Sequence, residues 1–156
     1  MTAPTLTEFL LARIAEDEAV ARAAIDPNRP GTHWQWINYR DDTVLAAPTW
    51  EDMPVYLATV EGFATTSGVG DLPAFPLGHV EADEPRAMPH IARHDPARVL
   101  AECEARRRIV DEASELLALN EGTSVWMAAA AHARRTLRHI ATVYADHPNF
   151  DEAWRA

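Results

Sequence analysis

The chain has 156 residues, a length that fits one domain able to bury a hydrophobic core of its own. Hydrophobic residues make up 47% of it and charged residues 24%, which is ordinary for a soluble globular protein, and no apolar run approaches the roughly 20 residues that cross a bilayer. The formal net charge of −10 argues against nucleic acid as a partner, because nucleic-acid binders carry a basic surface.

The single cysteine, Cys103, excludes an internal disulfide and suits the reducing cytoplasm. The first residues lack the basic and then apolar order of a signal peptide, so we expect a cytoplasmic protein with no membrane span. All 14 of the lysine and arginine residues are arginines, which excludes Schiff-base and P-loop chemistry and is typical of a GC-rich genome.

The first segment, residues 1–26, is expected to be a helix. Thr5 and Glu8 have the spacing of a capping box, in which each side chain satisfies a backbone N–H at the other residue. An apolar stripe at helical spacing follows, formed by Leu6, Leu10, Ile14, Ala21 and Ala24. Asp26 and Pro27 then end the helix.

Residues 33–60 are rich in aromatic and β-branched residues and predict an antiparallel hairpin, at 33–39 and 43–46, followed by a third strand at 55–60. Residues 61–89 carry many turn residues and predict a long loop with a short edge strand near 77–80.

Helices return in residues 90–146. A short helix meets a long one that begins at Pro96, and a last helix begins with Ser124 as its cap, before a tail at residues 147–156. We therefore predict a single α+β domain, residues 1–156, with three long helices packed with a small antiparallel sheet.

Polar residues interrupt the apolar stripes of the predicted long helices. Arg106 falls on the stripe of the long helix, and Asp17 falls on that of the first helix with Arg13 close by. Burying a lone charge is costly, so either Arg106 and Asp17 pair across two helices or they line a polar pocket with one or more histidines. In the last helix the expected inner face consists of Val125, Ala129, Thr136, Ile140 and Val143, bordered by His132 and His139.

His90 and His94 are one helical turn apart, the spacing of helical metal sites, with Asp95 as a nearby oxygen donor. His139 or His147 would have to supply a further ligand. A divalent metal is therefore an alternative, although no cofactor is predicted, because residue 91 is Ile and the glutamate of a His-Glu-x-x-His zinc site is missing. The competing interpretation is structural: Asp95 caps the helix that begins at Pro96, and the imidazoles fill polar niches.

Several segments resemble an uncharacterised family of small proteins from actinobacteria, especially streptomycetes, and from actinophages. They are the motif HIARHDPARVL at residues 90–100, the run at 104–109, the opening at 9–24, and the ending at 144–148 with Trp154 and Arg155. The resemblance implies no activity. It selects as candidate binding residues His90, His94, Asp95, Arg98, Arg106, Asp146 and His147.

No complete catalytic constellation is present in the sequence, so the leading hypothesis is a non-catalytic binding or regulatory protein of actinobacterial or phage accessory type. Its expected partner is another protein or a second copy of itself. One alternative is a metal-dependent hydrolase that uses His90, His94 and Asp95. The other is a nucleic-acid accessory protein, which rests on the basic run at residues 106–108.

Overall fold

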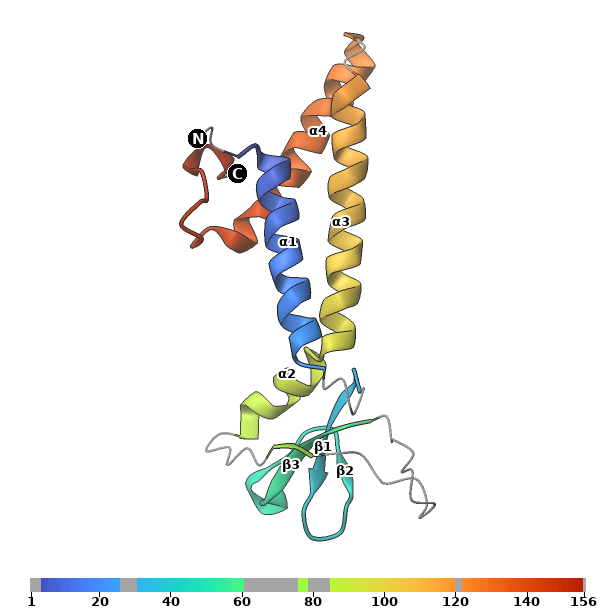
Figure 1. Ribbon diagram of the computed structural model, residues 1–156, viewed down its shortest axis with the longest axis vertical. Coiled ribbons are helices and arrows are strands. Elements are labelled where there is room, and N and C mark those ends of the chain that lie inside the picture. The colour runs from blue at the N-terminus through green and yellow to red at the C-terminus, as the bar shows by residue number, and fades with distance from the viewer. Residues whose placement is uncertain (1–3, 26–30, 61–75, 79–84, 120–121, 156) are drawn as a thin grey trace. The chain divides into compact units, whose positions relative to one another are not determined.

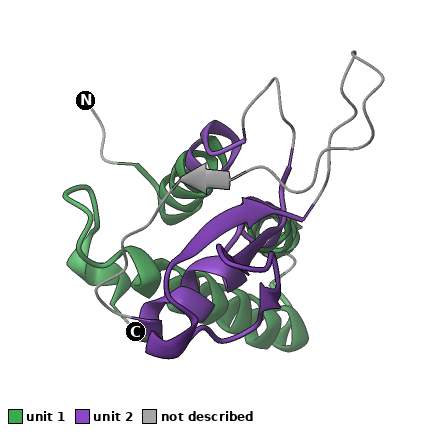
Figure 2. Cartoon of the chain, turned by 90° about the horizontal axis from the view of Figure 1, so that it is seen from below, with its two compact units in different colours: residues 1–19, 101–156 green, residues 20–100 purple. Residues whose placement is uncertain are grey.

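Four α-helices and a four-stranded antiparallel sheet make up the described part of the chain in the computed structural model, residues 4–25, 31–60, 76–78, 85–119 and 122–155 (Figure 1). The predicted α+β fold class is confirmed. The chain forms two compact units, one of residues 1–19 with 101–156 and one of residues 20–100, coloured green and purple in Figure 2. We call them unit 1 and unit 2.

The sheet belongs to unit 2 and has the strand order β2-β1-β3-β4. Its strands are β1 (Trp34–Asn38), β2 (Val44–Leu45), β3 (Val55–Thr59) and β4 (Pro76–Gly78). Trp36 is paired with Leu45 on one side and with Leu57 on the other, so the predicted hairpin and third strand are confirmed. The predicted edge strand exists as β4, antiparallel to β3. The predicted loop at 61–75 and 79–84 lies outside the described residues, and its last part, residues 85–89, is helical instead of a loop: Pro85–Ala87 form a 3-10 turn, and a helix begins at Met88.

Helix α2 (Met88–Arg93) packs on the sheet and closes the core of unit 2. Trp36, Val55, Leu57 and Met88 are the buried residues of this core, and Ile91 of α2 packs against them. The indole nitrogen of Trp36 donates a 2.6 Å hydrogen bond to the backbone carbonyl of Met88. A fully buried tryptophan needs such a partner, so this bond fixes where α2 begins on the sheet.

Unit 1 contains most of α1 (Leu6–Ala23), most of α3 (Pro96–Leu119) and all of α4 (Ser124–Ala141). The predicted capping box starts α1: the Glu8 carboxylate accepts from the backbone N–H and hydroxyl of Thr5, and the Thr5 hydroxyl accepts from the N–H of Glu8. Thr123, not Ser124, caps α4, because the Thr123 hydroxyl accepts from Trp126 N. None of the described helices is both long and apolar enough to span a membrane.

The predicted inner faces of α1 and α3 are largely confirmed, but that of α4 is wrong. In α1 and α3 the central positions Leu10, Ile14, Cys103 and Val110 are fully buried. By contrast, Val125 of α4 is 78% exposed, and Val143, in the 3-10 turn Thr142–Tyr144 that follows α4, is 64% exposed. The buried residues of this helix are Ala130, Ala133, Leu137 and Ala141.

The buried face of α4 consists of three alanines and Leu137. Alanines also lie on its exposed face, so they do not mark the inner one, and Val125 and Val143 lie outside it. The Trp126 indole nitrogen donates a 3.1 Å hydrogen bond to the carbonyl of Leu116. This bond holds the start of α4 against α3 while the face with Ala130 and Ala133 is buried.

The C-terminal tail folds back on α1 through aromatic rings. Phe9 is buried, and its ring centroid lies 6.0 Å from that of Phe150 and 4.9 Å from that of Trp154. The last turn, Glu152–Trp154, is capped by Asp151, whose carboxylate accepts from Ala153 N. The tail is thus an ordered part of unit 1.

Candidate functional site

The His90–His94 pair lies exposed on α2 and at its C-terminal cap in unit 2. The two ring centroids are 4.1 Å apart with an interplanar angle of 35°. His94 Nδ1 lies 2.9 Å from the backbone oxygen of His90, and this oxygen accepts the Nδ1 proton. The ring of His94 therefore covers the end of α2, as the structural interpretation expects, and keeps Nε2 as its free nitrogen.

Asp95 is buried and caps α3. Its Oδ1 accepts a 2.8 Å hydrogen bond from Arg98 N, and its Oδ2 lies 3.4 Å from the backbone N–H of Trp34. One oxygen thus starts the long helix, and the other ties that start to strand β1. Arg98 takes part in this cap through its backbone.

These contacts bear on the proposed metal ligands. Both carboxylate oxygens of Asp95 face backbone donors, which a metal ion at this carboxylate would have to displace. His139 belongs to unit 1 and is exposed on α4. Within the described ranges, no group of three or more His, Cys, Asp or Glu side chains is arranged to hold a metal ion.

The predicted Arg106–Asp17 ion pair is confirmed and lies in unit 1. Arg106 Nη1 is 3.6 Å from Asp17 Oδ2, and its Nη2 is 3.5 Å from Glu102. The Tyr144 hydroxyl donates a 2.7 Å hydrogen bond to the same Asp17 oxygen. Burial and this hydrogen bond raise the pKa of Tyr144 to about 12.

Arg13 and His147 form the second polar contact of unit 1. Arg13 is buried, and its Nη1 lies 2.6 Å from His147 Nε2. Its guanidinium also lies over the Phe9 ring, 5.3 Å from the centroid, where a cation is favoured. Asp146, next to His147, is exposed. Arg106 and His147 therefore hold α3 and the tail to α1.

The basic run of α3 is neutralised within unit 1. Arg106 pairs with Asp17, Arg107 Nη2 lies 3.2 Å from Glu18, and Arg108 pairs with Glu104. The run on which the nucleic-acid alternative rests is thus an ion-paired helix face, as the sequence reasoning favoured.

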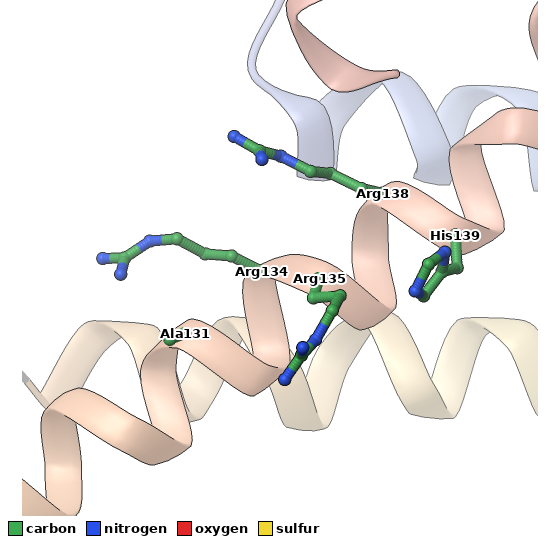
Figure 3. A pocket seen from close by; sticks show the side chains of 5 residues that line it. All are labelled: Ala131, Arg134, Arg135, Arg138 and His139. Carbon is green, nitrogen blue, oxygen red and sulfur yellow. The ribbon is translucent and has the colours of Figure 1, made fainter. Parts of the chain in front are cut away.

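A second group of arginines, which the sequence reasoning missed, lies on the outer face of α4 (Figure 3). Arg134, Arg135 and Arg138 line a hollow of about 370 Å³ together with Ala131 and His139. All three arginines are exposed. Across the described residues, none of the three forms an ion pair or a side-chain hydrogen bond.

A signal for this group was present in the sequence. The 18 residues of α4 contain three arginines and two histidines and no aspartate or glutamate. In a chain with 24 acidic residues, a helix without any is unusual, and its cations have no carboxylate at the i±3 and i±4 positions of the same helix. We call Arg134, Arg135 and Arg138 the arginine cluster.

The described residues thus form an α+β fold in which Arg106 and Asp17 are paired with one another and the last long helix carries three exposed arginines that form no ion pair with any of them. The chain matches, over residues 3–156, the family of unknown function DUF6221, and it belongs to this family. The expectation of membership in an uncharacterised family is thereby confirmed. No curated protein and no solved structure matches the chain.

Proposed function

We propose that this protein is a small non-catalytic binding protein that recognises an acidic segment of a protein partner through the arginine cluster. The observation that carries the proposal is that Arg134, Arg135 and Arg138 form no ion pair in the described part of the chain. A guanidinium offers five donors in a planar fork that fits carboxylates, and three such forks in little more than one helical turn favour an anionic ligand.

The contrast with the other arginines supports this proposal. Arg106, Arg107 and Arg108 on α3 each face a carboxylate of unit 1. The consecutive arginines of α3 thus all form ion pairs with carboxylates of this acidic chain. The arginine cluster departs from this pattern on a face that is open to solvent.

The size and charge of the surface favour a peptide over a nucleic acid. Arg134 and Arg138 are four residues apart, a helix rise of about 6 Å, which matches neighbouring acidic side chains of one peptide. A duplex would extend far beyond the cluster, over a molecule whose formal net charge is −10. The arginine cluster attracts anions only locally, whereas the rest of the negatively charged protein repels them. A long polyanion is therefore disfavoured relative to a short acidic peptide.

The proposal also covers the cellular location and the origin of the protein. Buried, single Cys103 and the absence of lysine support a cytoplasmic accessory protein of actinobacterial or phage origin. Burial raises the pKa of the Cys103 thiol, which keeps it protonated and unreactive at neutral pH.

The test is fluorescence polarisation with a labelled acidic probe, acetyl-Asp-Glu-Ala-Ala-Glu-Asp-amide. We expect weak, salt-sensitive binding that falls at least tenfold in the triple variant Arg134→Gln, Arg135→Gln, Arg138→Gln. The matched control changes Arg93, Arg108 and Arg155 to Gln, which alters net charge equally and leaves the arginine cluster intact. An equal loss in both variants would contradict the proposal.

Two further measurements address other occupants. Tighter binding of a single-stranded oligonucleotide than of the peptide, at the same ionic strength, would overturn the proposal in favour of nucleic acid. Sedimentation of the wild-type protein alone tests a second copy. A dimer that only the triple variant of the arginine cluster dissociates would make this chain its own partner and would also overturn the proposal.

A further inference from the structure

A second hollow, of about 300 Å³, shares two arginines with the first. Arg134 and Arg138 line both, whereas Arg135 lines only the first. The shared arginines stand beside apolar side chains from α1, α3, α4 and the tail, namely Leu6, Leu117, Leu137 and Trp154. We call this feature the amphipathic hollow. All of its lining residues belong to unit 1.

The apolar wall of the amphipathic hollow is held in place by contacts outside it. Trp154 rests against the buried ring of Phe9, and Phe150 meets the same Trp154 ring at 5.8 Å between centroids. Leu137 is buried in the core of unit 1. The wall therefore exists before any ligand arrives, which reduces the ordering cost of binding.

Two other polar side chains of the hollow already have partners. The Thr5 hydroxyl is engaged with Glu8 in the capping box, and the Thr7 hydroxyl lies 3.3 Å from that of Ser114. The guanidinium groups of Arg134 and Arg138 form no ion pair within the residues that the structure describes, and they are the charged groups of the hollow that remain for a ligand. A ligand that fits must present a bulky apolar group and a carboxylate side by side.

We propose that the amphipathic hollow binds a partner segment in which a bulky apolar side chain, Leu or Phe, is flanked by acidic residues. The apolar side chain enters between Leu117 and Trp154, and the flanking carboxylates bind Arg134 and Arg138 at the rim. A volume of about 300 Å³ accommodates one or two such side chains and no folded element. This inference rests on the proposed function and assigns the specificity of the same surface.

The first test compares two labelled peptides of equal charge on the wild-type protein. Acetyl-Asp-Glu-Leu-Phe-Glu-Asp-amide is expected to bind at least tenfold more tightly than the probe with Ala-Ala at its centre, because burial of a large apolar side chain adds to the charge contacts. Equal affinities would overturn this inference and leave the proposed function standing. Binding of neither peptide would overturn both.

The second test locates the apolar contact. Leu117→Ala should reduce the advantage of the Leu-Phe peptide about tenfold and leave the Ala-Ala peptide unaffected. The matched control is Leu119→Ala, on the same helix but outside the hollow and 61% exposed, which should change neither affinity. An equal effect of the two variants would overturn the assignment.

The third test does not depend on a variant. In methyl NMR spectra of the wild-type protein, the Leu-Phe peptide should shift Leu6, Leu117 and Leu137, and leave Leu57, in the core of unit 2, in place. Shifts confined to methyl groups outside the hollow would overturn the inference.

Discussion

The Tyr144 hydroxyl donates a 2.7 Å hydrogen bond to Asp17 Oδ2, the same oxygen that lies 3.6 Å from Arg106 Nη1. Arg106 Nη1 also reaches the Tyr144 oxygen at 3.4 Å, so the three side chains form a closed triangle. The triangle joins α1, α3 and the turn that follows α4 within unit 1. It satisfies charges that would otherwise interrupt apolar helix faces at a cost in free energy.

The first prediction is that Asp17 and Arg106 are energetically coupled. Asp17→Asn and Arg106→Gln should each lower the free energy of unfolding by about 1 kcal/mol. The double variant should lose about 0.5 kcal/mol less than the sum, because the second change has no ion pair left to break. The Arg106 side chain is 31% and the Asp17 side chain 38% exposed, which keeps the coupling small. Urea unfolding measures the cycle, and strict additivity would show that the pair contributes nothing.

The second prediction concerns alkaline pH. Burial and the hydrogen bond to Asp17 raise the pKa of Tyr144 to about 12, above the value of about 10 in an unfolded chain. The folded state therefore favours the protonated phenol, and this contribution to stability is complete below about pH 10 and is lost as the pH rises through 12.

Tyr144→Phe is the variant that checks the pH dependence. At neutral pH it should be less stable than the wild type by about 1 kcal/mol, because the hydrogen bond to Asp17 is gone. Between about pH 10 and 12 its stability should fall less steeply, so that the two urea-unfolding curves approach each other. Parallel pH profiles for the two proteins would exclude a raised pKa at Tyr144 as the cause.

The fold was predictable where bulky residues mark the buried face. Leu10 and Ile14 mark the buried face of α1, and Val110 marks that of α3. Large apolar side chains at helical spacing lie on one side of a helix, and that side is the one buried in the core. In α4 the signal failed. Alanines occupy both its inner and outer faces, for example Ala133 and Ala131, and Val125, which the spacing predicts to be buried, is exposed.

The candidate site divides in a similar way. The pairing of Arg106 with Asp17 was predictable, because a charge on an apolar stripe requires a partner. The arginine cluster was not recognised, because arginines on the polar face of a helix are what any solvated helix shows. Only the three-dimensional arrangement reveals that Arg107 also has a carboxylate of α1, Glu18, within reach, whereas Arg134 forms no ion pair in the described part of the chain.

The third prediction tests Asp95 as a helix cap. Asp95→Ala removes the acceptor for Arg98 N and for Trp34 N and should cost about 1–2 kcal/mol of unfolding free energy. Asp95→Asn retains one side-chain oxygen and should cost clearly less. Hydrogen exchange should accelerate at the amides of Arg98 and Trp34 in the alanine variant.

The control for the Asp95 variants is His94→Ala at an exposed position, where we expect the free energy of unfolding to change by no more than about 0.5 kcal/mol. A larger loss from His94→Ala than from Asp95→Ala would contradict the role assigned to the carboxylate.

The last prediction concerns the close approach of two backbone segments in unit 2. A Cβ atom at Gly31 would lie 2.4 Å from Thr59 Cγ2 and 2.5 Å from Thr59 Cβ, and Thr59 is itself buried at the end of β3. Because the second atom is attached directly to the strand backbone, a side-chain rotation cannot relieve the overlap, and Gly31→Ala should lower the free energy of unfolding by about 2 kcal/mol. Gly122→Ala is the matched control: that position has φ +69° and no atom near its Cβ, so its cost is backbone strain alone, about 1 kcal/mol. Thermal and urea unfolding compare the two variants. If Gly31→Ala proved the milder one, β3 would have to yield at Thr59 far more easily than its pairing with β1 implies.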